Sequence, residues 1–271
     1  DEAVAELRQK MGLDRPVAVR YFDWLGNALQ GDLGESWQMG VPITPLLIVR
    51  FRNSLVLALF ALVLIVPTAL IGGIIAGLYE NKKTDVVISL VGLFTTSLPE
   101  FVTATILILV FAWWLRILPG NSVLENEAAN PILEPVKLIL PSLTLAISQF
   151  GYLSRITRVS IAKVMKSAYI RTAVLKGMPY WQVVLRHALR NALLAPITVV
   201  TTNLGWMIGG LIVIENVFAY PGLGRMMAGA AQVNDVPMLE ASTLLGVTFA
   251  VSSQLLADIL YAVLNPRIRY D

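Results

Sequence analysis

Two acidic side chains interrupt apolar stretches of this sequence and are its clearest candidates for chemistry. Glu100 is the only charged residue in Val86–Leu115, and Asp258 is the only one in Ala241–Leu264. Placing an ionised group in apolar surroundings is costly, so such a residue indicates a functional site by default. For Glu100 we consider two roles, the lining of a polar pathway and pairing inside a helix bundle. For Asp258 we expect pairing with a base.

The residue types that are missing exclude several other chemistries. The 271 residues contain no cysteine and a single histidine, His187, which excludes disulfides, thiol catalysis and His-rich zinc sites. No GxxxxGK[ST] phosphate-binding loop occurs, so the chain is not expected to hydrolyse ATP alone. We therefore expect a protein that is not an enzyme and that holds no metal or cofactor of its own.

The composition is that of a chain whose main solvent is lipid. Hydrophobic residues make up 56% of the chain and charged residues 14%, with a mean hydropathy of +0.69. Ordinary soluble domains hold about 45–50% apolar and about 25% charged residues. A disordered chain is excluded as well, because it would combine low hydrophobicity with a high net charge, whereas the net charge here is +3.

Five stretches are long and apolar enough to cross a hydrocarbon core of about 30 Å as helices. The clearest is the uncharged run Asn53–Tyr79. Val86–Leu115 is too long for one upright helix, and Pro99 predicts a bend within it. The sequence thus predicts an all-α polytopic membrane protein with five transmembrane helices, the remaining ones in 138–154, 191–214 and 241–264.

The distribution of Lys and Arg predicts the orientation of the chain. With five spans, one set of connections and the C-terminus hold 12 of these residues, and the opposite set holds 3. Because cytoplasmic loops are enriched in basic residues, the first set is predicted to be cytoplasmic. Residues 53–264 then form the transmembrane domain, 265–271 a cytoplasmic tail and 1–52 a periplasmic segment.

The periplasmic segment is nearly balanced in charge. Two short helices are predicted in it, Glu2–Met11 and Pro16–Leu29, the second with a proline in its first turn. An external segment needs something to carry it across the membrane, and the chain opens Asp1-Glu2 with no signal peptide. We therefore expect a further span before it, which makes six.

The predicted cytoplasmic connection 155–191 carries the strongest functional signal. Eight Lys or Arg and no acid lie between Arg155 and Arg190, and a connection of this length is usually functional or has structure of its own. Helices are predicted at Ala162–Lys176 and Tyr180–Asn191, with a break at Gly177-Met178-Pro179. We expect a helical hairpin that projects from the membrane.

The hairpin sequence resembles that of a known family. Ala168-Tyr-Ile-Arg-Thr-Ala-Val-Leu-Lys-Gly177 and Val184-Leu-Arg-His-Ala-Leu-Arg-Asn-Ala-Leu-Leu-Ala-Pro196 look like the coupling loop of permease subunits in binding-protein-dependent ATP-binding-cassette (ABC) importers. The resemblance is greatest to the peptide and nickel branch, in particular its dipeptide and oligopeptide permeases of the first type, and covers essentially the whole chain after the family's first span. Further stretches resemble this branch in its order: Gly12-Leu-Asp-Arg-Pro16, Gly31-Asp-Leu-Gly-Glu-Ser36, Glu215-Asn-Val-Phe-Ala-Tyr-Pro-Gly-Leu-Gly224 and Asn265-Pro-Arg-Ile-Arg269.

The resemblance implies a type I ABC importer permease fold with cytoplasmic coupling helices, in a bacterial inner membrane. It implies a homologous second permease, two cytoplasmic ATPase subunits that bind ATP and Mg, and an extracytoplasmic substrate-binding protein. The implied activity is import of di- or oligopeptides by alternating access. Nickel complexes and glutathione-like substrates remain alternatives.

By the same resemblance, the hairpin docks into a groove on an ATPase subunit. The general family pattern has Glu-Ala-Ala where this chain has Arg171-Thr172-Ala173, which leaves open the ionic contacts that the loop makes. Simpler roles also stay open, since basic residues can contact anionic lipid and Gly177 can act only as a helix terminator. The candidate coupling residues are Tyr169, Arg171, Thr172, Ala173, Lys176, Gly177, Arg186, His187 and Arg190.

A second group of candidates follows the fourth predicted span. The turn Tyr220-Pro-Gly-Leu-Gly224 lies there, and a turn rich in Gly and Pro is tolerated at membrane depth where it faces protein or a water-filled cavity. We place an outer gate at this turn. The candidate pathway or gate residues are Pro99, Glu100, Glu215, Asn216, Phe218 and Pro221.

A self-contained secondary transporter or channel is the alternative from another class. It would need no ATPase, and inverted repeats or several ionisable residues within the spans would favour it, but neither is clear in the sequence. A membrane-bound structural subunit would show no substrate-dependent behaviour. Membrane lipid is an expected partner, and nucleic acid is not.

Overall fold

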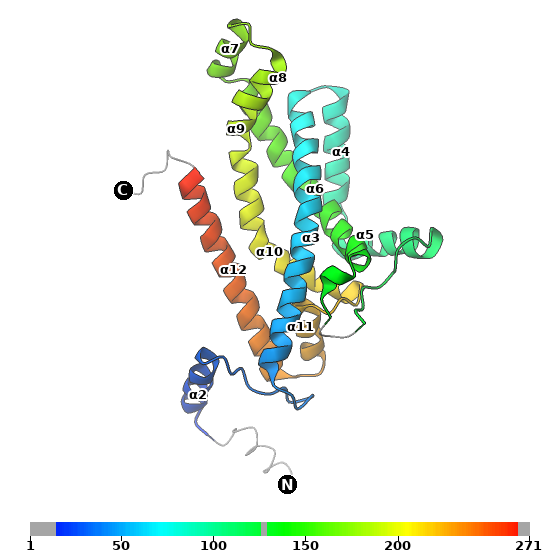
Figure 1. Ribbon diagram of the computed structural model, residues 1–271, viewed down its shortest axis with the longest axis vertical. Helices are drawn as coiled ribbons and strands as arrows, with labels where there is room; N and C mark the ends of the chain where they lie inside the picture. The colour runs from blue at the N-terminus through cyan, green and yellow to red at the C-terminus, as the bar shows by residue number, and fades with distance from the viewer. Residues whose placement is uncertain (1–14, 126–128, 265–271) are drawn as a thin grey trace.

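The described part of the computed structural model, residues 15–125 and 129–264, is a bundle of long helices (Figure 1). Its regular secondary structure is helical, and one isolated bridge joins Glu35 to Pro42. Three helices are long and apolar enough to cross a membrane, and two bent helix pairs raise the number of spans to as many as five. The predicted all-α polytopic fold is confirmed.

The centre of the bundle is the pair α3 (Ile43–Leu78) and α6 (Val136–Met165). Their backbones approach closely where α3 has glycine: a Cβ added to Gly77 would lie 2.7 Å from Ile161 Cβ. Such close approach is typical of helix packing in membranes, where dispersion contacts replace the hydrophobic effect between helices. α3 begins before the uncharged run at Asn53 and therefore extends beyond the apolar part of the span.

The second predicted span is bent, as Pro99 indicated. α4 (Lys83–Ser97) packs against α6 and is followed by α5 (Glu100–Leu107) and the π-helix η1 (Ile108–Trp114). The two parts meet at an angle of 102°, because Pro99 has an extended backbone and interrupts the ladder of helical hydrogen bonds. η1 and the short helix η2 (Pro131–Leu133) lead into α6.

The C-terminal part adds three helices, α10 (Leu194–Val217), α11 (Leu223–Gln232) and α12 (Val236–Leu264). The segment Tyr180–Ala192, which comprises α8 (Tyr180–Gln182), the π-helix η3 (Val183–Ala188) and α9 (Leu189–Ala192), meets the first part of α10 at 40°. The short helix α11, which we did not predict, packs with α12 and the start of α3 around a buried apolar cluster that includes Ile43, Leu223 and Met238.

The predicted helix at Pro16–Leu29 is confirmed as α2 (Val17–Leu29), whereas Glu2–Met11 lies outside the described residues. After α2, a tight turn is fastened to the start of α12. Asp235 accepts hydrogen bonds from the hydroxyl of Ser36 and from the Trp37 amide, the latter at 3.2 Å. The N-terminal segment is thereby tied to the C-terminal helices.

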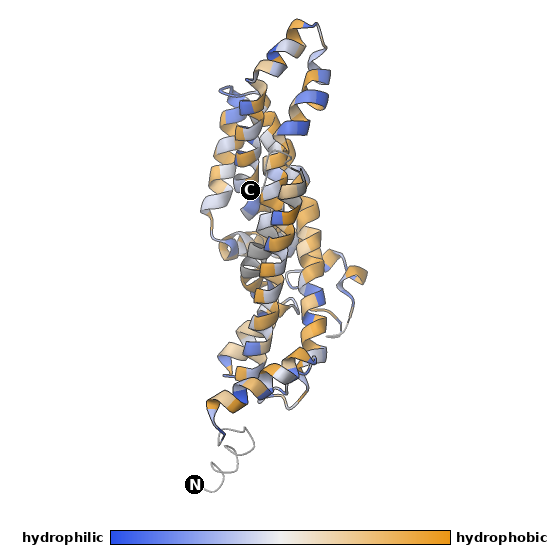
Figure 2. Cartoon of the chain, turned by 90° about the vertical axis from the view of Figure 1, so that its left-hand side faces the viewer, coloured by the Kyte–Doolittle hydropathy of each residue, from blue (hydrophilic) through white to orange (hydrophobic). Residues whose placement is uncertain are grey.

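Hydropathy divides the molecule along its length (Figure 2). The central parts of the long helices are mainly hydrophobic, and strongly hydrophilic segments gather toward the end that carries α7 (Ala168–Leu175) and α8. We call this the hairpin end, and the opposite end, with α11 and the start of α3, the far end (Figure 1).

Candidate functional site

The hairpin begins with a break in the helix that the sequence predicted as continuous over Ala162–Lys176. That prediction is wrong: α6 ends at Met165 and α7 starts at Ala168. Ser167 between them has an extended backbone (φ −71°, ψ 153°) and donates a hydrogen bond from Oγ to the carbonyl of Val164 at 2.6 Å. A serine hydroxyl that bonds to a nearby backbone carbonyl competes with the backbone hydrogen bonds of a continuing helix, and serine is favoured where a helix starts.

The break predicted at Gly177 is confirmed. Gly177 has φ +76°, and its amide donates to Val174 O at 2.9 Å while the Met178 amide donates to Ala173 O at 3.3 Å. This is the hydrogen-bond pattern of a Schellman cap, which needs a left-handed residue that glycine adopts without steric cost. Pro179 then precedes the next helical segment. The direction of the chain at the turn is therefore set by the positive φ of Gly177 together with the fixed φ of Pro179.

The hairpin has a small apolar core of its own. Ile170, Ala173, Val183 and Ala188 are buried against one another, and Asn191 Nδ2 donates a hydrogen bond to Tyr169 Oη at 3.0 Å across the two arms. A unit held by its own core can move as one body.

The base of the hairpin is fixed to the bundle by an ion pair that the sequence analysis missed. Arg158 on α6 donates to both carboxylate oxygens of Asp85, from Nε and, at 2.7 Å, from Nη2. Asp85 is buried and also accepts from the Asn81 amide at 2.8 Å and from Ser89 Oγ at 3.2 Å. The start of α4 is thus locked to the part of α6 that leads into the hairpin.

At the far end, the carboxylate of Glu215 caps α11. Glu215 is fully buried; its Oε1 accepts from Ser54 Oγ, and its Oε2 accepts from the Arg225 amide at 3.0 Å. Ser54 Oγ in turn accepts from the Leu223 amide at 2.8 Å. An acidic group at a helix N-terminus satisfies amides without helical partners and interacts favourably with the helix dipole. A Cβ at Gly222 would overlap the Glu215 carboxylate.

The turn between α10 and α11 is also bonded to α3 through Asn53. Asn53 Nδ2 donates to Pro221 O at 2.9 Å, and the Tyr220 hydroxyl donates to Asn53 O at 2.7 Å. The Tyr220 side chain is fully buried, so its hydroxyl group is satisfied by this bond inside the protein. We call these residues, Asn53, Ser54, Glu215, Tyr220 and Pro221, the far-end cluster.

Comparison with known proteins identifies the family. Residues 69–270 match the model of the binding-protein-dependent transport system inner membrane component. The chain belongs to this family. The match covers α4 to α12, including both the hairpin and the far-end cluster's turn after α10.

Two relatives of this permease match nearly the whole chain in sequence. It is 36% identical over 271 residues to the glutathione transport system permease protein GsiC of Escherichia coli O6:H1 strain CFT073, covering 100% of this chain and 86% of that protein. It is 35% identical over 264 residues to the oligopeptide transport system permease protein AppB of Bacillus subtilis strain 168, covering 97% and 84%.

The fold of the permease also matches a solved transporter. A chain of the MetNI methionine ABC transporter in an inward-facing conformation superposes with a TM-score of 0.62 at 15% identity, covering 82% of this chain and 96% of that chain. The predicted type I importer permease fold is confirmed by this likeness.

The structure places the predicted coupling residues of the permease on one unit. Ala173 is buried in the hairpin core and His187 is half-buried. The others are exposed on the two arms: Tyr169, Arg171, Thr172, Lys176, Gly177, Arg186 and Arg190. The arrangement presents a basic surface with apolar side chains at its tip, where Leu175 is 81% exposed.

The predicted gate residues are divided between two places. Glu215, Phe218 and Pro221 are buried in or beside the far-end cluster, whereas Asn216 is exposed and donates from Nδ2 to Ile212 O of its own helix at 2.7 Å. Pro99 and Glu100 lie at the start of α5, where a Cβ added to Gly210 of α10 would be 3.1 Å from the Glu100 carboxylate oxygens. The Glu100 carboxylate therefore lies against α10, with part of its surface still accessible, and both roles considered for it stay predictions.

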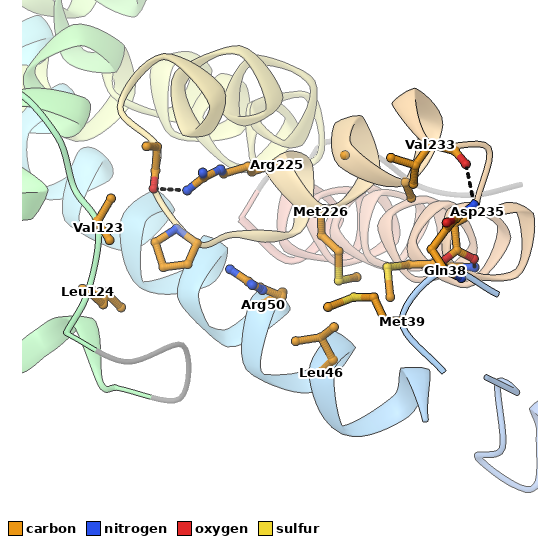
Figure 3. Close-up of a pocket in the computed structure, with 15 residues that line it drawn as sticks. Gln38, Met39, Leu46, Arg50, Val123, Leu124, Arg225, Met226, Val233 and Asp235 are labelled. Carbon is orange, nitrogen blue, oxygen red and sulfur yellow. Dashed lines mark hydrogen bonds between the residues drawn. The ribbon is translucent and has the colours of Figure 1, made fainter. Parts of the chain in front are cut away.

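The far end contains a cavity of about 290 Å³ between the N-terminal turn, α3 and α11 (Figure 3). Arg50 of α3 and Arg225 of α11 line it, with the Arg225 guanidinium donating to Ala219 O, and Met39, Met226 and Met238 contribute flexible apolar surface. No motif or spacing in the sequence singled out these arginines and methionines as residues that line a cavity. Next to the cavity, the contact between Asn53 and the lining residue Pro221 joins positions 168 residues apart.

Proposed function

We propose that this permease is a pathway-forming subunit of an ATP-driven importer that moves di- or oligopeptides across the bacterial inner membrane by alternating access. The names of the relatives support peptides, since one is an oligopeptide permease and the other a permease for glutathione, itself a small peptide. The chain lacks a phosphate-binding loop, so ATP and Mg would bind on partner subunits.

The proposed assembly contains a homologous second permease, two cytoplasmic ATPase subunits and an extracytoplasmic binding protein that delivers substrate. The hairpin end faces the cytoplasm in this proposal, as does the C-terminus, because the basic residues gather there. The hairpin is the surface that docks on an ATPase subunit. The observation that carries this role is a unit with its own apolar core and an exposed tip at Leu175 and Gly177.

The route for motion runs from the hairpin into the bundle. α6 is packed on α3 and α4 with glycine at the contacts, and Arg158 is bonded to Asp85 on α4. When ATP closes the ATPase subunits, displacement of the hairpin would therefore move α3, α4 and α6 as a body, since packed helices move rigidly. The bend at Pro99 and the far-end cavity would change their access to either side in the same movement.

Two equally exposed leucines test the docking role. Leu175 at the hairpin tip is 81% exposed, and Leu133 on η2 is 79% exposed. We expect Leu175→Glu to release the ATPase subunits during purification in mild detergent, because a charge would be buried at the interface, and Leu133→Glu to retain them. Mass spectrometry of the purified complexes measures this. Equal retention in both variants would contradict docking at the tip.

Glutathione is the second candidate substrate, favoured by the 36% identity to a glutathione permease. Peptide-stimulated ATP hydrolysis by the purified assembly, with its binding protein present, distinguishes the two. Stimulation by di- and oligopeptides supports the main proposal, and stimulation by glutathione alone would replace it with the second.

A further inference from the structure

The segment from Glu100 to Ile117 turns away from the bundle and forms a lateral arm. α5 packs against α6 and α10, and Ile108 and Phe111 of η1 pack on the same core, whereas Trp113 and Trp114 at the end of η1 are exposed. Figure 1 shows the arm running sideways from the long helices. The tip is closed by its own backbone, since the Ile117 amide donates to Phe111 O at 3.0 Å. The arm is thus a projection whose helix ends in a hydrogen bond to its own backbone.

The length of α4 sets the depth of the arm. α4 begins at Lys83 at the hairpin end, and its 15 residues rise about 22 Å. The extended residues Leu98 and Pro99 add about 6 Å. The arm therefore lies about 28 Å from the level of Lys83, close to the far edge of a hydrocarbon core about 30 Å thick.

The surface of the arm is apolar up to its tip and then becomes basic. Between Glu100 and Arg116 there is no charged residue. Trp113 and Trp114 are each 73% exposed, and Leu109 is 52% exposed. Tryptophan is enriched where acyl chains meet headgroups, and arginine at a span's edge reaches lipid phosphate.

We propose that this arm lies flat in the outer leaflet and that its partner is membrane lipid. Trp113 and Trp114 sit at the level of the headgroups, and Arg116 contacts lipid phosphate. Lipid fits better than a protein partner because exposed tryptophans with an arginine beside them, at the edge of the hydrocarbon core, are the residue types enriched at the headgroup boundary. The arm then fixes the depth of the bend at Pro99. The choice of leaflet rests on the orientation in the proposed function.

Spin-label accessibility tests the proposal in the assembled importer in lipid nanodiscs. The chain contains no cysteine. A single cysteine introduced by W113C, or by L109C as a second variant, is therefore the only position of this chain that takes the spin label. I71C on α3, 58% exposed, reports the hydrocarbon interior, and L29C on α2 at the far end, 82% exposed, reports water. Collision rates are measured with oxygen, which partitions into lipid, and with a water-soluble nickel chelate.

We expect the ratio of oxygen to nickel collisions at positions 109 and 113 to be several-fold higher than at position 29, with position 113 below position 71. Protection from both reagents would mean that protein covers the arm, and a ratio equal to that at position 29 would mean that water covers it. Either result overturns the proposal. Peptide-stimulated ATP hydrolysis, measured on the same preparations, tests the proposed function separately, so the two can fail independently.

Discussion

Ser54 on α3 donates a hydrogen bond to Glu215 at the end of α10, 161 positions later in the chain. The same serine oxygen accepts from the first residue of α11, Leu223, and the same carboxylate accepts from Arg225. One buried side-chain pair therefore holds the end of α10 and the start of α11 against α3. A cluster of this kind is strongly stabilising only while all its partners are present, since a buried polar group without a partner is costly.

Glu215→Ala should reduce stability clearly. The change removes an acceptor for the Ser54 hydroxyl and the Arg225 amide, and hydrogen bonds to charged groups contribute about 1.5–3 kcal/mol each. We expect a loss of about 3 kcal/mol, or a fall in melting temperature on the order of 10 °C, in thermal unfolding in detergent. The adjacent control Asn216→Ala, an exposed position, should change little. Equal shifts in both variants would contradict the clamping role.

Asp85 and Arg158 should be coupled in a double-mutant cycle. Removing one partner of a buried ion pair costs about 3–5 kcal/mol, and Arg158 retains 26% side-chain exposure, so we expect about 3 kcal/mol for Asp85→Ala. The double variant should lose little more than either single one. The exposed pair Lys166–Glu80, with Lys166 68% exposed, should contribute less than about 1 kcal/mol. Additive losses at Asp85 and Arg158 would exclude coupling.

Two glycines should respond oppositely to the same substitution. A Cβ at Gly151 would overlap the Gly92 carbonyl and Thr96 Oγ1 of α4, whereas a Cβ at Gly229 in α11 meets nothing within 4 Å. We expect Gly151→Ala to destabilise by about 1–3 kcal/mol through overpacking, and Gly229→Ala to be neutral or to stabilise by about 0.5–1 kcal/mol. Melting temperatures of the two purified variants provide the measurement. A stable Gly151→Ala protein would show that α4 and α6 are less closely packed.

Glu100→Gln should alter transport without altering assembly. The amide has nearly the shape of the carboxylate that packs against Gly210, so we expect a change in stability within about 0.5 kcal/mol. The negative charge at the start of α5 is lost, and an ionisable residue within a span marks a substrate pathway by default. We therefore expect transport to change. The rate of peptide uptake and the range of peptides accepted measure the effect. If both are unchanged, Glu100 has only the packing role.

Much of the fold could be predicted from the sequence because its signals are local. Uncharged runs gave the spans, Pro99 gave the bend, and Gly177 gave the turn of the hairpin. The break at Ser167 was missed because the segment around it has good helical pattern, and the serine's bond to Val164 O becomes visible only in the structure.

The candidate site was harder to predict because its contacts are long-range. Glu215 could be singled out as an acid near the end of a span, but its role as a cap depends on Ser54 and on α11. Nothing in the sequence pairs Asp85 with Arg158, or Asp235 with Ser36, because each pair is brought together by the packing of helices or turns remote in the chain.

ATP-driven uptake of a labelled peptide into proteoliposomes that contain the complete assembly and its binding protein tests directly whether this permease works as an ATP-driven peptide importer. Gly177 has open space around it, and a residue other than glycine at its φ of +76° costs about 1–2 kcal/mol of backbone strain. Gly177→Arg should therefore leave the permease inserted, with a small loss of stability, and place a large side chain at the docking surface. We predict that uptake by the unaltered assembly requires ATP and that Gly177→Arg abolishes both uptake and peptide-stimulated ATP hydrolysis. Uptake that proceeds without ATP, or at a near-normal rate in this variant, would contradict the account.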